Sequence, residues 1–113
     1  METIEERVER LEFYNELTVK SIDLSAYPFY ALIMENKLTE EEMQETEELC
    51  TRLAKKYEVM QEEGFVHYTA LLIEFAGMLT PKLKPRQAIM ALRDQDLFLP
   101  LMKKLYELSL TYE

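Results

Sequence analysis

The chain contains few of the residues that interrupt regular structure. Its 113 residues include only two glycines, four prolines and no tryptophan. Sheet proteins need frequent turns, and turns draw heavily on glycine and proline. The good helix formers leucine, glutamate, methionine and lysine are abundant instead. This composition predicts an all-α fold, multihelical, with five to six helices.

Single copies of cysteine and histidine restrict the chemistry that the chain can carry. Cys50 alone cannot form an internal disulfide, which suits a reducing compartment, and it falls on an apolar helix face where a buried, inert thiol is typical. His67 has no partner at a metal-ligand spacing. The acidic run 40–42 suits the start of a helix better than a cation site. We therefore expect no catalytic residue, no metal and no cofactor.

Long hydrophobic runs are also missing, and the net charge is −9. The longest apolar stretch, 70–79, is half the length of a membrane span, and the N-terminus does not resemble a secretory signal. An acidic surface repels phosphate backbones and anionic lipids, so we expect no binding to nucleic acid or membrane and a cytoplasmic location. Lys82, Lys84 and Arg86 form a small basic group, which is read as ordinary surface charge although a use for it stays open.

A heptad seam runs through the first 22 residues and is the clearest positive signal. Its members follow one another at spacings of four and three residues, with charged residues on both flanks. We predict that this seam is the interface of a homo-oligomer, a dimer or a trimer, formed by Ile4, Val8, Leu11, Asn15, Thr18 and Ile22. The alternative is an ordinary amphipathic helix that packs on its own domain. Phe13 and Leu17 lie off the seam and indicate a second apolar face.

The remaining sequence predicts a single domain, 1–113, with an oligomerisation helix at 1–22 and a helical core at 23–113. Thr39 and Glu42 form a capping box that starts the longest helix, which should end near Gly64. The apolar segment 68–79 is predicted to be the central helix of the core. Further short helices should follow Pro28 and Pro85. A last helix, about 97–111, should present the apolar face Phe98, Leu101, Leu105, Leu108 and Tyr112.

Several short motifs resemble a known family. They are Arg7-Val8-Glu9-Arg10-Leu11-Glu12, Tyr27-Pro28-Phe29-Tyr30-Ala31-Leu32, Gly64-Phe65-Val66 and Phe75-Ala76-Gly77 followed by Leu83. Together they make nearly the whole chain similar to the YhaI-like proteins of bacilli, a small family classed as a domain of unknown function. The resemblance implies an all-helical cytoplasmic protein that forms a homo-oligomer. It implies no active site, because none of the motifs carries chemistry.

Three functions are compatible with these patterns. The leading hypothesis is a non-enzymatic assembly or regulatory protein that acts through protein–protein contacts, with itself as the main partner and another protein as a further one. The second is a small-molecule-sensing module with an aromatic pocket formed by Tyr27, Phe29, Tyr30 and Phe75. The third is an enzyme of a type that the sequence does not reveal.

Overall fold

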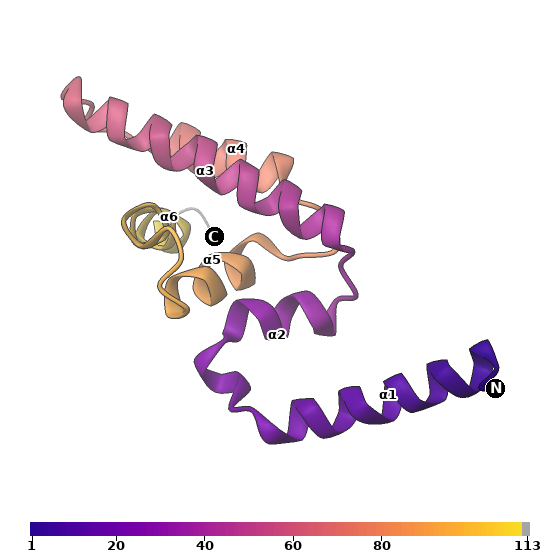
Figure 1. Ribbon diagram of the computed structural model, residues 1–113. Coiled ribbons are helices and arrows are strands. Elements are labelled where there is room, and N and C mark those ends of the chain that lie inside the picture. Colours follow the sequence, from indigo (N-terminus) through magenta and orange to yellow (C-terminus); the bar gives the residue numbers. More distant parts are fainter. Residues whose placement is uncertain (112–113) are drawn as a thin grey trace.

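The computed structural model describes residues 1–111, and within that range the chain is helical and contains no strand (Figure 1). The all-α prediction is therefore confirmed. Tyr112, which was assigned to the face of the last helix, lies outside the described residues. In chain order the elements are α1 (Ile4–Ser21), a short 3-10 helix η1 (Leu24–Ala26), α2 (Pro28–Glu35), α3 (Glu40–Glu62), α4 (Thr69–Met78), α5 (Pro85–Asp94) and α6 (Leu99–Thr111).

The capping box predicted from the sequence defines the start of α3, and a threonine cap also defines the start of α1. The Thr39 hydroxyl accepts a hydrogen bond from the Glu42 amide at 3.1 Å, and the Glu42 carboxylate accepts one from the Thr39 amide at 2.8 Å. Thr3 caps α1 in the same manner, accepting from the Glu6 amide at 3.1 Å. Such bonds satisfy amides that have no partner inside the helix. The long helix α3 ends where Gly64 adopts a φ of 78°, a left-handed conformation that glycine accepts without strain.

The start of α2 is capped from a distant part of the chain. Pro28 occupies the first turn, where its fixed φ suits a helix, and no side chain of the preceding segment caps the helix. Instead, the Gln95 side-chain oxygen accepts hydrogen bonds from the amides of Phe29 at 2.9 Å and Tyr30 at 3.2 Å. Gln95 lies just after α5, so this cap fixes α2 against α5.

One hydrophobic core joins α2 to α6. In Figure 1, α3 and α4 lie side by side, α5 and α6 lie beneath them, and α2 packs on the far side of α5. The largest fully buried side chains come from all five helices: Phe29, Phe75, Leu53, Leu71, Ile89, Leu92, Leu101, Met102, Leu105 and Cys50. Burial of each large apolar side chain contributes about 1.5–3 kcal/mol.

The prediction that the apolar segment 68–79 forms the centre of the core is wrong. Within α4, only Leu71 and Phe75 are buried, and they face α3 and α6. Ile73 is 67% exposed and Met78 is 60% exposed. The helix is apolar on nearly all sides, and this uniformity hid which side faces the core. The centre is shared by α5 and α6. Helix α5 packs against α2 and α6 and buries Ala88, Ile89, Ala91 and Leu92, and α6 also packs against α3 and α4.

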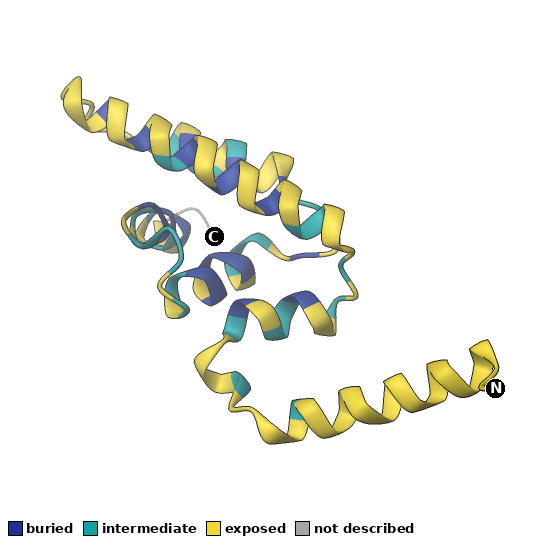
Figure 2. Cartoon of the chain, viewed as in Figure 1, coloured by how far each residue is buried: buried dark blue, intermediate teal, exposed yellow. Residues whose placement is uncertain are grey.

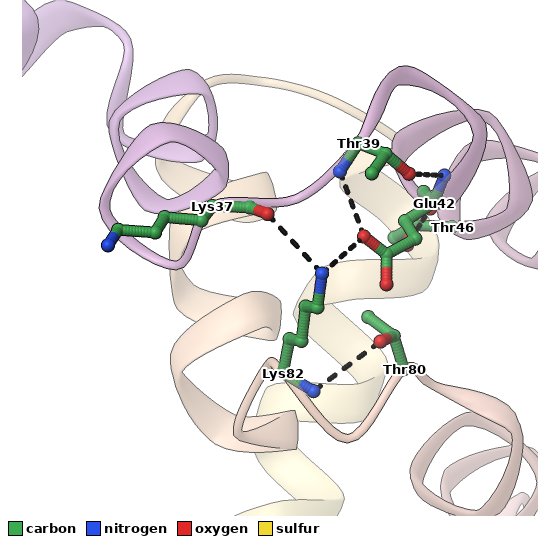
Figure 3. Close-up of polar contacts among 6 residues, drawn as sticks. All are labelled: Lys37, Thr39, Glu42, Thr46, Thr80 and Lys82. Carbon is green, nitrogen blue, oxygen red and sulfur yellow. Dashed lines mark hydrogen bonds and ion pairs between the residues drawn. The ribbon is translucent and has the colours of Figure 1, made fainter.

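An ion pair ties the loop before α5 to the start of α3 (Figure 3). The Lys82 ammonium donates to the Glu42 carboxylate at 2.7 Å and to the Lys37 carbonyl at 3.3 Å. The hydrogen bond from Lys82, helped by the one from the Thr39 amide, lowers the pKa of Glu42 below its ordinary value of 4.5. Lys82 therefore has a structural role, and the small basic group is not simply free surface charge.

We predict that the two sides of α4 respond very differently to truncation. Phe75→Ala should lower the free energy of unfolding by about 3–5 kcal/mol, because a fully buried ring is lost and a cavity is left. The matched change Ile73→Ala, two residues away on the exposed side, should cost less than about 1 kcal/mol. Urea titration of both variants measures the difference. Equal costs would mean that α4 is buried on both sides.

We also predict that Glu42 stabilises the fold only when it is ionised. Because its folded-state pKa is lowered, its contribution is present above pH 4.5 and is lost as the pH falls through the folded-state pKa. Glu42→Gln should therefore lower the free energy of unfolding at pH 7, and the gap from the parent chain should close towards pH 3. Urea titrations across this range measure the gap. The control is Glu41→Gln, which removes the same charge from the same turn. If it gives an equal loss at pH 7, the ion pair has no effect of its own.

Candidate functional site

The first helix stands apart from the helices that form the core. No residue of α1 is buried, and Figure 2 shows the helix exposed along almost its whole length. The molecule extends 64 Å along its longest axis and about 25 Å across, with a radius of gyration of 17.5 Å. A compact domain of 113 residues would have a radius of about 13 Å. The alternative that the heptad seam packs on its own domain is therefore not what the described chain adopts.

The six predicted interface residues all lie on this exposed helix or directly after it. The apolar members remain largely in solvent, with exposed fractions of 81% for Ile4, 46% for Val8, 54% for Leu11 and 48% for Ile22. The Thr18 hydroxyl donates to the Tyr14 carbonyl at 2.8 Å, so its hydrogen-bonding capacity is met within the helix. The Asn15 side chain is exposed.

The C-terminal half of α1 borders a groove that α2 closes on its other side. The groove has a volume of about 510 Å³. Its α1 wall consists of Asn15 and Val19, and the other walls include Leu24, Ala31, Ile33, Met34 and Leu38. Val19 is the one residue of α1 that is half-buried. The two helices are therefore close enough to share a groove but not close enough to bury each other's side chains.

A second apolar hollow continues from this groove across η1. It has a volume of about 290 Å³ and is lined by Ile22, Leu24, Tyr27, Tyr30 and Met34. The rings of Tyr27 and Tyr30 are stacked, with centroids 5.9 Å apart and planes 3° apart. The interface predicted from the sequence did not include this outer face of α2. The available signal was that α2 is apolar on most sides, more than a helix with one buried face requires.

The aromatic pocket predicted from Tyr27, Phe29, Tyr30 and Phe75 does not form. Phe29 and Phe75 are fully buried within the core, whereas Tyr27 and Tyr30 line the exposed hollow beside η1. The four residues were grouped because they are aromatic. The helical periodicity of α2, however, places Phe29 and Tyr30 on different faces.

A separate hollow lies over α4, α5 and the end of α6. Its volume is about 410 Å³, and its lining is almost entirely apolar: Leu72, Ile73, Ala76, Pro85, Arg86, Ile89 and Ser109. The Arg86 guanidinium donates to the Ser109 carbonyl at 3.3 Å, so it is held by α6. The exposed side of α4 forms one wall, which explains in part why this helix is apolar beyond its core-facing residues.

The side chains that could act as nucleophiles, bases or metal ligands do not lie together in one site. Cys50 is fully buried in α3, and desolvation raises the pKa of its thiol to about 12, which disfavours the reactive thiolate. His67 is exposed in the loop before α4. Within residues 1–111, no group of three or more His, Cys, Asp or Glu side chains is placed to hold a metal ion. In the same range, no helix has both the length and the apolar character to cross a bilayer.

The arrangement defines an all-α protein whose main candidate site is an apolar surface shared by an exposed first helix and the outer face of α2. Comparison with known families adds the classification. The chain belongs to the family described as "Protein of unknown function (DUF1878)", whose model matches residues 1–109. The match spans α1 to α6, so the exposed first helix is part of the family's own domain and not an addition to it.

Proposed function

We propose that this protein is a non-enzymatic, cytoplasmic assembly or regulatory protein that works through protein–protein contacts, and that α1 is its self-association element. The observation that carries the proposal is an 18-residue helix with no buried residue and many large apolar side chains in solvent. These are Ile4, Val8, Leu11, Phe13, Tyr14 and Leu17.

Two physical arguments support a partner for α1. An isolated helix of this length is marginally stable in water, so packing of its apolar face normally supplies most of its stability. A contiguous apolar patch larger than a few hundred Å² on a soluble protein marks an interaction site. A second copy of the chain is the simplest partner, because a heptad seam is complementary to itself across a two-fold axis. The resemblance to YhaI-like proteins of bacilli also favours a homo-oligomer.

A small-molecule-sensing role is the second candidate, and the hollow over α4, α5 and α6 supports it. Its volume of about 410 Å³ lies within the range of ligand pockets, and its lining is apolar. Both roles are compatible in one protein, since this hollow and α1 belong to different parts of the chain. Native mass spectrometry of the samples described next distinguishes them, because a retained apolar compound adds mass to the single chain.

We predict that substitutions on the two sides of α1 separate self-association from folding. Leu11 and Phe13 are both 54% exposed in the single chain, but helical periodicity places them on opposite sides of α1. Leu11→Ser should raise the dissociation constant of the oligomer at least ten-fold, because a seam side chain loses its apolar contact. Phe13→Ser should leave the dissociation constant within about two-fold. Size-exclusion chromatography with light scattering, over a dilution series, measures both.

The parent chain provides the reference for this comparison. At about 50 μM its average mass should be close to twice the single-chain mass of 13.5 kDa or above it, since about nine-tenths of the chains are dimeric at that concentration when Kd is ~1 μM. A parent mass of 13.5 kDa would contradict self-association. Dissociation by Phe13→Ser with Leu11→Ser unaffected would place the interface on the opposite face of α1. Thermal melting of both variants checks that the core is intact.

A further inference from the structure

The heptad positions of α1 carry information about how two copies would be oriented. With spacings of four and three residues, the seam residues at positions a are Val8, Asn15 and Ile22, and those at positions d are Ile4, Leu11 and Thr18. The flanking positions e and g differ sharply in character. Positions e are Glu5, Glu12 and Val19, and positions g are Arg7, Tyr14 and Ser21. The e flank is therefore acidic in the N-terminal half of α1, and the g flank carries the positive charge of Arg7 there.

This asymmetry favours one orientation over the other. In a parallel pair, position g of one helix lies against position e of the next heptad of its partner. Arg7 of each copy would then lie against Glu12 of the other, giving two attractive pairs. In an antiparallel pair, position e of one helix faces position e of the other, and g faces g. The acidic flank with Glu5 and Glu12 would then lie against the same acidic flank of the partner. Like charges that lie side by side destabilise a helix pair.

The polar member of the seam supports the same orientation. In a parallel, in-register pair, position a meets position a, so Asn15 lies opposite its own copy and two amides can share hydrogen bonds. In an antiparallel pair, position a meets position d, and Asn15 would be left against an apolar side chain or Thr18. The Thr18 hydroxyl already donates to the Tyr14 carbonyl within its own helix.

The groove between α1 and α2 offers a place for the next pair along the seam. After Arg7 and Glu12, a parallel pair sets Tyr14 of one copy against Val19 of the other. Val19 lines the groove of about 510 Å³ that α2 closes with Ala31 and Met34. Tyr14 is 53% exposed in the single chain, and such a ring fits an apolar groove whose rim is polar.

The size of an adequate interface gives a further argument for including α2. A specific interface of standard size buries roughly 800 Å² per partner and involves about 20–30 residues on each side. The 18 residues of α1 alone fall short of this, particularly because only one side of the helix would be covered. The outer face of α2, with Tyr30 and Met34 exposed, supplies additional apolar surface next to the seam.

We propose that a second copy of this chain occupies the seam in parallel and in register, with Arg7 of each copy against Glu12 of the other and Tyr14 of each copy in the other's α1–α2 groove. This inference rests on the self-association proposed above and adds its orientation and register. The partner that covers the seam is the α1 helix of an identical chain.

A reciprocal pair of charge reversals tests the orientation. Arg7→Glu alone places two acidic pairs across a parallel seam, and Glu12→Arg alone places two basic pairs there. Each variant alone should raise Kd about ten-fold at low salt, with a smaller rise at 1 M salt. Mixing the two variants brings opposite charges together at both positions, so the mixed dimer should regain a Kd within about three-fold of the parent. Native mass spectrometry separates the three dimers by mass.

The outcomes distinguish the parallel register from self-association through α1, on which it rests. A raised Kd for each variant alone, together with a Kd near that of the parent for their mixture, supports the parallel register. If the mixture associates no better than either variant alone, while Leu11→Ser still dissociates the parent, the orientation is overturned and self-association stands. A parent chain that is single at all concentrations overturns both. Circular dichroism and thermal melting of each variant must match the parent. Glu9→Arg, away from the seam, is the control for the net charge change of +2 that Glu12→Arg makes.

Discussion

A helix in water that buries no residue against its own chain must obtain its stability from elsewhere, and α1 is such a helix. Ordering each residue costs about 1–2 kcal/mol in backbone entropy, and internal hydrogen bonds barely offset that cost in a helix of 18 residues. The Thr3 cap contributes about 1 kcal/mol, which is not enough. The apolar seam supplies the missing term only if it is covered. This requirement is the physical basis of the proposal that α1 is half of an interface.

The core is built so that it does not depend on α1. The helices α2 to α6 bury a common set of side chains, the Gln95 cap fixes the start of α2, and the Lys82–Glu42 pair ties the loop before α5 to α3. The outer face of α2 is left over from this packing and lies beside the seam. An independent core with an adjoining pair of uncovered apolar surfaces suits a protein whose assembly is separate from its folding.

Local features were predictable from the sequence, whereas long-range partners were not. The Thr39 cap, the helix starts at Pro28 and Pro85, and the stop at Gly64 follow from short-range rules and were placed correctly. The cap from Gln95 links residues more than sixty positions apart, so no local sequence pattern predicts it. The prediction for α4 was wrong because the sequence of a helix that is apolar on nearly every side does not show which side packs on the core. The heptad spacing of residues 4–22 can be read from the sequence, whereas the groove beside Asn15 and Val19 depends on tertiary packing.

Hydrogen–deuterium exchange of α1 amides as a function of protein concentration tests the central claim most directly. If a second copy stabilises the helix, amides from residues 7–21 should exchange slowly at about 100 μM and much faster at about 0.1 μM, while the protection of α3 and α5 stays constant across the dilution. Rapid exchange of α1 at both concentrations would mean that the helix has no partner in solution. Slow exchange at both, with the mass of a single chain, would mean that the chain itself protects α1. Either result would contradict the account.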